Sequence, residues 1–376
     1  MVNQNRLVDT FLNLVQVDSE TMFEQQISKV LWAKFTALGL TALEDGSAAR
    51  TGHQSGNLLF TLEATAGMEH VPTFFFTCHM DTVAPGIGIK PRVEDDGFIR
   101  SDGTTILGAD DKAGIATMLE AIQLLQESGA AHGRILFVIT AGEEKGLLGS
   151  RFMDEGFVKA EFGYALDSNG TIGSIAVAAP GQYKLTMTFH GKSAHAGVNP
   201  EDGISAITVA AKAVSRMKLG RIDPETTANI GSFSGSGETN VVCDTAVLRG
   251  EARSIDAEKL ERQVEAMYEA CNSVAHEMGA QFVFEREKIY PAYVHGDDSL
   301  VVSLAKRAIE NIGATPYTFP SGGGSDANVF NGMGIPTVNL AVGYNQIHTV
   351  NENIAIADLV RTAEMVLAII EEVAKP

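Results

Sequence analysis

A histidine and a carboxylate close the first strongly apolar stretch of the chain, TFFFTCHMDTVAPG, which begins at Thr73. His79 and Asp81 are two residues apart, so on a strand both side chains would project from the same face. An isolated pair of this kind is typical of a hydrogen-bonded strand end. The alternative is a metal-bound histidine whose ring is oriented by the neighbouring carboxylate.

Three further apolar stretches end in residues that can bind metal ions. RILFVITAG runs into Glu143 and Glu144, FGYALDSNG has Asp167 at its end, and IPTVNLAVGYNQIHT brings His348 shortly after a strand. Ligands of open α/β sheets gather at the carboxyl ends of the strands, so we expect these side chains to meet His79. Each one alone has an ordinary explanation as part of a solvated loop or a turn.

The segment SDGTTILGADDKAG places Asp110 and Asp111 before a helix that we expect to begin near Ala113. Both could be N-cap residues, and we expect this for Asp111 at least, although one of the two could reach the site at the strand ends. Two histidines and several carboxylates, without cysteine, are ligands that suit zinc, cobalt or manganese. One bridging carboxylate, with a histidine and a second carboxylate on each ion, would satisfy a two-metal site.

The elements that must position these residues alternate between apolar strands and helices, which predicts an α/β core covered on both faces. From Gly181 the strands alternate apolar and polar residues instead of being apolar throughout. The elements from YKLTMTFHG to QFVFEREKIY follow the order βαββαβ, the ferredoxin-like arrangement. After Pro291 the pattern of helices and strongly apolar strands returns. We therefore expect one discontinuous α/β domain, residues 1–180 and 292–376, with a smaller domain, residues 181–291, inserted in it.

The first long helix is predicted in TMFEQQISKVLWAKFTALGL, where Thr21 and Glu24 have the spacing of a capping box and Gly39 marks the end.

Composition excludes several classes of protein. A chain of 376 residues with 45% hydrophobic residues can bury a substantial core. The formal charge of −19 and the lack of a Lys/Arg block argue against nucleic acid as a partner. The start of the chain does not have the pattern of a signal peptide, and no stretch has the length of a membrane span, so we expect a cytoplasmic protein without a membrane partner. Cys78, Cys243 and Cys271 are scattered and indicate neither a disulfide framework nor a thiolate zinc site.

The motifs HMD, GADDKAG, AGEE, LDSNG, SAHAG and the late IHT resemble, in order and spacing, the dizinc exopeptidase and amidohydrolase family that includes peptidase T, carboxypeptidase G and aminoacylase. The resemblance covers nearly the whole chain, and within the family DGTTILGADDKAG is most similar to tripeptidase T. It implies a zinc-exopeptidase-like α/β/α catalytic domain, with the βαββαβ insertion as its lid domain.

By position, the resemblance implies that Asp110 bridges two divalent metal ions. His79 and Asp167 would complete the site of one ion, and Glu144 and His348 the site of the other. Zinc would be the metal, with cobalt and manganese as alternatives.

The resemblance also implies roles in catalysis. Asp81 would orient His79, and Glu143 would be the general base that takes a proton from a metal-activated water and passes it to the leaving amine. His195, in GKSAHAG, would hold the oxyanion, either after lid closure or across a dimer interface. The ordinary alternative is a loop in which Ser193 or His195 bonds the backbone.

Substrate contacts are implied for three further positions. Asn240 in ETNVV and Arg253 in GEARS resemble lid residues that hold the substrate, although Arg253 could equally be a surface charge at a strand end. The loop SGGGSDAN lacks the spacing of a phosphate loop. Its glycines, Gly323 among them, would let the backbone pass close to substrate, or else form a flexible turn.

The first hypothesis for function is a dizinc aminopeptidase that removes the N-terminal residue of short peptides, tripeptides above all. Three departures from the tripeptidase T pattern concern substrate choice rather than metal binding: AGEE where that pattern has PDEE, Ala196 in place of Pro, and Ser321 in place of Arg. The second hypothesis is an N-acyl amino acid amidohydrolase or carboxypeptidase of the same family, with Arg253 on a carboxylate. The third is a non-catalytic metal-binding or peptide-binding module, against which Glu143 argues. A homodimer through the inserted domain is the alternative to a closing lid.

Overall fold

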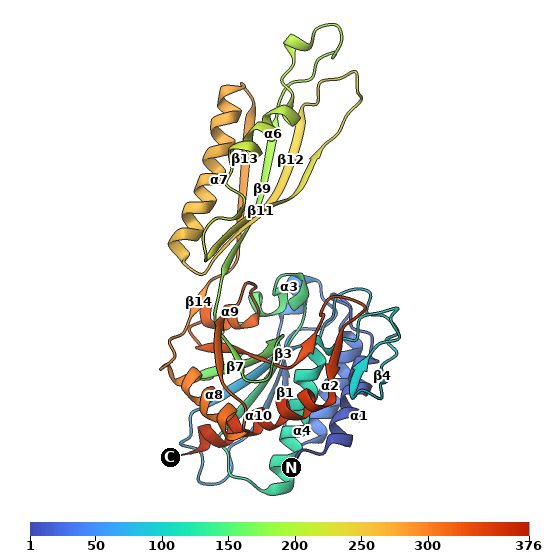
Figure 1. Ribbon diagram of the computed structural model, residues 1–376, viewed down its shortest axis with the longest axis vertical. Coiled ribbons are helices and arrows are strands. Elements are labelled where there is room, and N and C mark those ends of the chain that lie inside the picture. Colours follow the sequence, from blue (N-terminus) through green and yellow to red (C-terminus); the bar gives the residue numbers. More distant parts are fainter. Residues whose placement is uncertain (376) are drawn as a thin grey trace. The chain divides into compact units, whose positions relative to one another are not determined.

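The computed structural model describes residues 1–375 and divides into two compact units (Figure 1). The main unit comprises Met1–Ala178, Val294–Ser321 and the chain from Ser325 onward. The inserted unit comprises Ala179–Tyr293 together with Gly322–Gly324. These bounds lie within two residues of those expected from the sequence, except that the three glycines of the SGGGSDAN loop group with the inserted unit.

A nine-stranded mixed sheet lies at the centre of the main unit, in the order β1-β2-β6-β3-β7-β16-β8-β14, with β15 paired to β8. Its strands are β1 (Thr41–Glu44), β2 (Leu58–Leu62), β3 (Phe74–His79), β6 (Ile135–Thr140), β7 (Phe162–Ser168), β8 (Ser174–Ala179), β14 (Tyr293–Val294), β15 (Tyr317–Pro320) and β16 (Thr337–Ala341). Neighbours β6, β3, β7 and β16 run parallel. Their carboxyl ends therefore lie along one edge of the sheet.

Apolar side chains cover both faces of this sheet, as β3 shows. Phe74 and Phe76 point into the larger core, whereas Phe75 points to the other face and packs on Phe330, with ring centroids 4.6 Å apart. The larger core is closed by α1 (Gln4–Val15), α2 (Gln25–Ala37), α4 (Ala109–Ser128), α8 (Leu300–Asn311) and α10 (Ile356–Ala374). The opposite face carries α9 (Asp326–Gly332), with α5 (Leu148–Arg151) beside it and α3 (Ser47–Thr51) next to α5. The predicted α/β/α fold is confirmed.

A second, four-stranded sheet of the main unit, in the order β17-β18-β5-β4, was not predicted. Its strands are β4 (Arg92–Val93), β5 (Phe98–Arg100), β17 (Tyr344–Asn345) and β18 (Asn353–Ala355). Strands of two or three residues are too short to show the alternation that identifies a strand in sequence.

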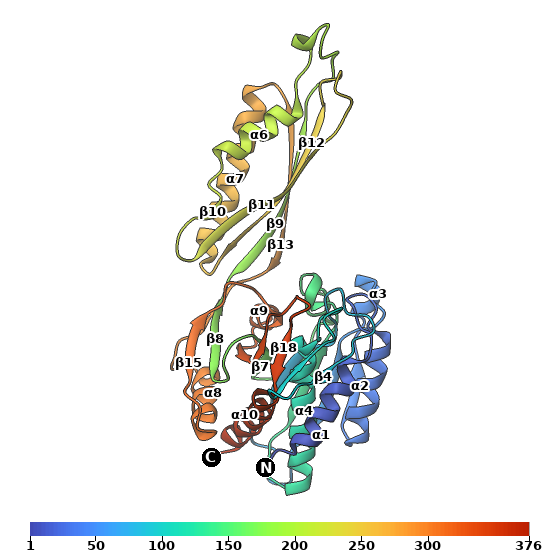
Figure 2. The same ribbon diagram turned by 45° about the vertical axis from the view of Figure 1, so that its right-hand side comes forward.

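The inserted unit is a five-stranded antiparallel sheet in the order β10-β11-β12-β9-β13. Its elements are β9 (Gly181–His190), α6 (Ala206–Arg216), β10 (Gly220–Arg221), β11 (Thr226–Gly235), β12 (Thr245–Ser254), α7 (Ala257–Glu277) and β13 (Gln281–Tyr290), with a short 3-10 helix at Pro200–Asp202. Both long helices pack on one face of the sheet, as Figure 2 shows. The predicted βαββαβ order is confirmed, with β10 as an additional short strand.

The predicted capping box of α2 is wrong. The helix begins at Gln25, and its N-cap residue Glu24 makes no side-chain cap. Thr21 Oγ1 instead donates to Asp81 Oδ2 at 2.8 Å, and Glu24 Oε1 accepts from the Met22 amide at 2.8 Å. The Thr21 hydroxyl therefore donates a charge-assisted hydrogen bond to the strand end. Because the helix begins at Gln25, Thr21 does not occupy its N-cap position.

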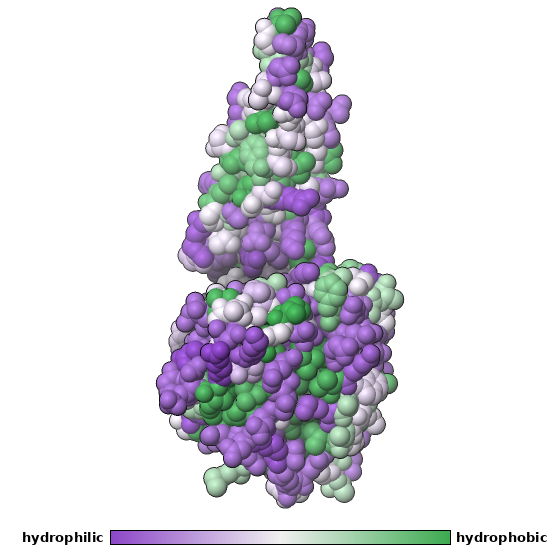
Figure 3. All heavy atoms as spheres, turned by 90° about the vertical axis from the view of Figure 1, so that its right-hand side faces the viewer, coloured by the Kyte–Doolittle hydropathy of each residue, from purple (hydrophilic) through white to green (hydrophobic). Residues whose placement is uncertain are grey.

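The surface drawn in Figure 3 is mostly hydrophilic, with hydrophobic side chains scattered among the polar ones. Among the described residues, no helix combines the length and the apolar character that crossing a bilayer requires.

Candidate metal centre

His79, at the end of β3, faces two carboxylates with one ring nitrogen. Its Nδ1 lies 3.0 Å from the carbonyl oxygen of Asp81, and because a carbonyl only accepts, Nδ1 carries the hydrogen. Nε2 faces Asp110 Oδ1 at 3.0 Å and Asp167 Oδ1 at 3.7 Å. Although burial opposes the charged form, hydrogen bonds to Asp110 and Asp167 raise the pKa of His79 well above its usual value, so that without a metal ion Nε2 donates to Asp110. When that proton is lost, Nε2 offers a lone pair between carboxylate oxygens, which is the arrangement of a histidine that can bind a cation.

Asp110 lies between two histidines. Its Oδ1 faces His79, and its Oδ2 lies 3.4 Å from Nε2 of His348. His348 Nε2 also lies 3.0 Å from Glu144 Oε1. The two oxygens of one buried carboxylate thus each meet a different histidine, as a bridging ligand would require.

Asp111 lies in the same cluster, and its predicted role as an N-cap is wrong. The backbone at Asp110 and Asp111 is not helical, and the N-cap of α4 is Gly108. Asp111 Oδ2 accepts from the amide of His79 at 3.3 Å, so its carboxyl faces β3 rather than the first amides of the helix. His79, Asp111 and Asp167 form one group whose ligand atoms lie within 4.8 Å of one another, and His79, Asp110 and Glu144 form a second.

Carboxylates outnumber the cationic side chains here. Lys112 is the one fully buried Lys or Arg side chain among residues 1–375, and its Nζ donates to Ser19 Oγ at 2.7 Å. Burial, together with the charge of Asp110, raises the pKa of Asp167 to about 7. Burial and the charge of Asp167 likewise raise the pKa of Glu143 well above its usual value. Divalent cations would supply the missing charge, and the nitrogen and oxygen donors fit zinc, cobalt or manganese.

The carboxylate of Asp81 holds the turn that carries both glutamates. Its Oδ1 accepts from the Glu143 amide at 3.0 Å, and its Oδ2 from the Glu144 amide at 3.3 Å. Its Oδ1 is 3.5 Å from His79 Nδ1, farther than the carbonyl of the same residue. Asp81 therefore contacts the histidine mainly through its backbone and the glutamates through its side chain.

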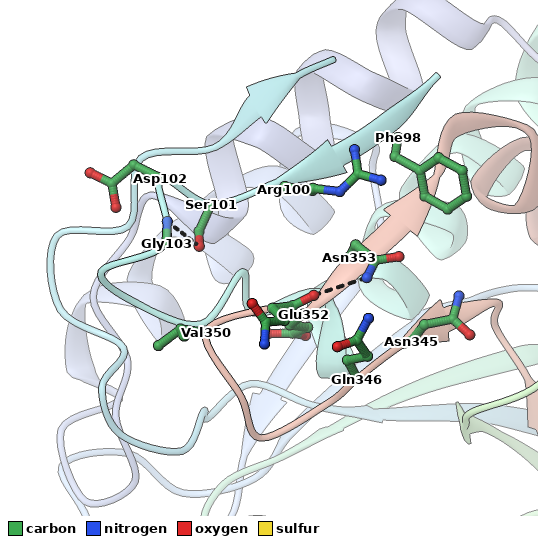
Figure 4. Close-up of a pocket in the computed structure, with 11 residues that line it drawn as sticks. Phe98, Arg100, Ser101, Asp102, Gly103, Asn345, Gln346, Val350, Glu352 and Asn353 are labelled. Carbon is green, nitrogen blue, oxygen red and sulfur yellow. Dashed lines mark hydrogen bonds between the residues drawn. The ribbon is translucent and has the colours of Figure 1, made fainter. Parts of the chain in front are cut away.

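Glu352 was missed in the sequence, although it follows His348 by four residues. Its buried carboxylate accepts from the amides of Leu107 and Gly108, both at 2.8 Å, and from the amide of Asp110 at 2.9 Å. It thereby joins the loop of His348 to the turn of Asp110. Figure 4 shows Glu352 on the wall of a cavity of about 890 Å³ between β5 and the segment from β17 to β18.

Asp326, in the SGGGSDAN loop, was also missed. Its two carboxylate oxygens accept from Thr140 Oγ1 and Ser150 Oγ, each at 2.5 Å. Thr140 is the last residue of β6, directly before the segment that leads to Glu143. The carboxylate therefore fixes this strand end, and only the position of Asp326 in a glycine-rich loop could have drawn attention to it.

In the inserted unit, His195 and Asn240 lie in neighbouring loops. His195 Nδ1 accepts from the amides of Gly197 and Val198, both at 3.1 Å, so a neutral ring carries its hydrogen on Nε2. The carbonyl of Asn240 accepts from the Ala196 amide at 2.8 Å. The backbone contacts that were the ordinary alternative for His195 are thus present, and they leave an exposed N–H donor.

Arg253 and the glycine loop have definite neighbours within the inserted unit. Arg253 donates to both oxygens of Glu251, at 2.9 and 3.2 Å. A side chain at Gly324 would come within 2.3 Å of the ring of Tyr290, whereas the space beside Gly323 is open. Glycine is therefore required at position 324 by the packing of a tyrosine.

Histidines and carboxylates thus gather at the carboxyl ends of the parallel strands of a mixed sheet, in an α/β unit that carries a ferredoxin-like insertion and could hold metal ions. The chain belongs to peptidase family M20/M25/M40, whose profile matches residues 75–372. This confirms the family resemblance predicted from the motifs.

Close relatives in this family are named as peptidases. The crystal structure of aminopeptidase PepT from Bacillus cereus is 57% identical in sequence, with a TM-score of 0.94 over 100% of both chains. That of a tripeptidase from Staphylococcus aureus is 47% identical, with a TM-score of 0.96 over 100% of both chains. Peptidase T of Geobacillus thermodenitrificans is 26% identical over 98% of each chain.

We predict that the metal-free protein loses stability as the pH rises from about 4 to about 10. Asp167 has a pKa raised from 3.8 to about 7, so its contribution is complete below 3.8 and is lost as the pH rises through about 7. Hydrogen bonds to Asp110 and Glu144 raise the pKa of His348 from 6.5 to about 10, and its contribution is lost in the same direction. The Tm of the protein, measured by thermal unfolding in the presence of a chelator at several pH values, tests this prediction. Zinc should raise the Tm more at the higher pH, and a Tm that rose with pH without metal would contradict the charge argument.

We predict that Glu352→Ala weakens the binding of divalent ions by about 10- to 100-fold, as loss of an outer-shell partner does elsewhere. The three amides that it holds would lose their acceptor, and the turn of Asp110 would no longer be fixed. Competition with a fluorescent chelator measures the affinity. Glu371→Ala, which removes an exposed carboxylate of α10, is the matched control. Wild-type affinity in the Glu352 variant would show that this carboxylate does not support the site.

Proposed function

We propose that the protein is a dizinc aminopeptidase that removes the N-terminal residue of short peptides, with tripeptides as the main substrates. The observation that carries the proposal is Asp110, whose two oxygens meet His79 and His348 beside a half-buried Glu143. The similarity to an aminopeptidase at 57% identity and to a tripeptidase at 47% identity supports the choice of substrate.

The proposed ligands follow from the two groups of side chains. Asp110 would lie between the ions, His79 and Asp167 on one, Glu144 and His348 on the other. Asp111, which the structure places near His79 and Asp167, would be an additional neighbour of the first ion. When bound, the ions supply Lewis acidity and a water of lowered pKa.

Glu143 would act as the general base. Its carboxyl is held by a turn whose amides bond Asp81, and burial and the charge of Asp167 raise its pKa. A carboxyl with a raised pKa accepts a proton at neutral pH and can return it to the departing amine. The protein therefore needs no covalent intermediate.

The inserted unit would supply contacts to the substrate. The Nε2–H of His195 is a donor suited to the oxyanion that forms at the scissile carbonyl. Asn240, Arg253 and Gly323 would contact the peptide, with the charge of Arg253 reduced by Glu251. A homodimer through this unit and a cytoplasmic location stay predictions.

Product analysis by mass spectrometry of one tripeptide in three forms, with zinc or cobalt supplied, tests the substrate class. We expect cleavage of the first peptide bond in the free and the C-amidated forms, and none in the N-acetylated form. The reason is that a centre rich in carboxylates attracts an α-ammonium group and repels a terminal carboxylate. Turnover of the N-acetylated form, weakened by C-amidation, would instead support the amidohydrolase or carboxypeptidase alternative.

Glu143→Gln is the control for catalysis in the same assay. It should keep both metal ions while turnover falls by about 10²- to 10⁴-fold, because the amide cannot take a proton. Glu155→Gln, an exposed position after the same turn, should behave as the wild type. Full activity in the Glu143 variant would remove the general base from the proposal.

A further inference from the structure

His53 and Glu24 form a buried pair behind the turn that carries Glu143. Their side chains are 1% and 0% exposed, and His53 Nε2 lies 3.8 Å from Glu24 Oε1. Neither His53 Nε2 nor Glu24 Oε2 has a hydrogen-bond partner among the described residues. Buried polar atoms without partners are rare, so the pair calls for an explanation.

The tautomer of His53 follows from its other neighbour. Thr51 Oγ1 donates to the Ser47 carbonyl at 2.9 Å and therefore accepts from His53 Nδ1 at 2.9 Å. Nε2 thus presents a lone pair to Glu24. Burial raises the pKa of Glu24 to about 7, so Glu24 can carry a proton beside this lone pair, but at 3.8 Å the two side chains are in contact without a hydrogen bond.

The ring of His53 also fills the space beside Gly142. A Cβ at Gly142 would lie 2.3 Å from His53 Cε1 and 2.4 Å from Nε2. Gly142 has a φ of +66° and is the N-cap of the short 3-10 helix Glu143–Lys145. This chain therefore has no room for a side chain at position 142 while His53 is present.

The segment that carries Glu24 reaches the same turn from a second side. Thr21 Oγ1 donates to Asp81, which accepts the amide of Glu143. Glu24 Oε1 accepts from the amide of Met22, directly after that threonine. The segment from Thr21 to Glu24 therefore contacts the turn of Glu143 in two ways. Thr21 acts through Asp81, and Glu24 packs against His53, which in turn packs on Gly142.

We propose that His53, hydrogen-bonded to Thr51 and packed between Glu24 and Gly142, is a positioning residue that fixes the Glu143 carboxylate for proton transfer. This rests on the proposed function, since it concerns the same general base. His53 does not touch the reacting atoms and acts through the backbone of Gly142. A displacement of about 1 Å in a catalytic group can cost about 100-fold in rate.

The experiment is a double-mutant cycle of His53→Ala and Gly142→Ala in the full chain with zinc, using the free tripeptide as substrate. Each single variant should lower kcat by about 10- to 100-fold, with KM and metal content within about twofold of the wild type. The double variant should recover part of the loss caused by Gly142→Ala, because the added methyl group then has space. Recovery should be partial, since alanine keeps the left-handed strain at position 142.

Variants of Glu24 separate positioning from simple loss of packing. A glutamine can accept from the Met22 amide and donate to His53 Nε2, so Glu24→Gln should keep kcat within about twofold, whereas Glu24→Leu should resemble His53→Ala. The acid limb of the pH–rate profile should move in His53→Ala and not in Glu24→Gln, because only the former releases the turn of Glu143.

Strictly multiplicative losses of the two alanine variants, or a wild-type kcat in a folded His53→Ala, would overturn the positioning role. The same cycle measured by thermal unfolding reports the contact between His53 and Gly142 whether or not the protein cleaves peptides. A wild-type protein that cleaved no tripeptide would overturn the proposed function. An active wild type without coupling between the two positions would overturn only the role of His53.

Discussion

Uncompensated negative charge at the carboxyl end of a parallel sheet is the constraint on which this structure depends. Asp110 and Asp111 are buried, with the half-buried Glu143 and Asp167 close to them, and Lys112 is the one fully buried Lys or Arg among residues 1–375. Ionised carboxylates at such distances destabilise one another unless protons or cations lie between them. The fold therefore creates a site where carboxylates outnumber the cationic side chains, so that bound cations would stabilise it.

Three buried carboxylates that are not proposed as ligands keep the surrounding loops in place. Asp81 accepts the amides of the Glu143 turn, Glu352 accepts the amides around Asp110, and Asp326 accepts two hydroxyl groups near the end of β6. Each joins segments that are far apart in the sequence. A metal site on loops is thereby as well fixed as one on regular elements, which is what a general base beside two ions requires.

The sequence predicted the fold because apolar strands, helices and the βαββαβ order leave periodic patterns that do not depend on distant residues. From the strand ends it also predicted that His79, Glu144, Asp167 and His348 gather at one sheet edge, whereas Asp110, which precedes a helix, was assigned by the family resemblance. Asp111 was placed wrongly because its backbone departs from the helix at the point where local rules would make it a cap. The contact of His53 with Gly142 leaves no local pattern, because the two residues are distant in sequence and meet only after folding.

The most direct test is a crystal structure of the zinc-loaded protein with anomalous differences collected at the zinc edge. The account predicts two anomalous peaks, with Asp110 contacting both, His79 contacting one and His348 the other. A single peak, or two peaks of which only one is contacted by Asp110, would contradict the claim that this carboxylate joins two metal sites and that the buried charge of the sheet edge is balanced by a pair of ions.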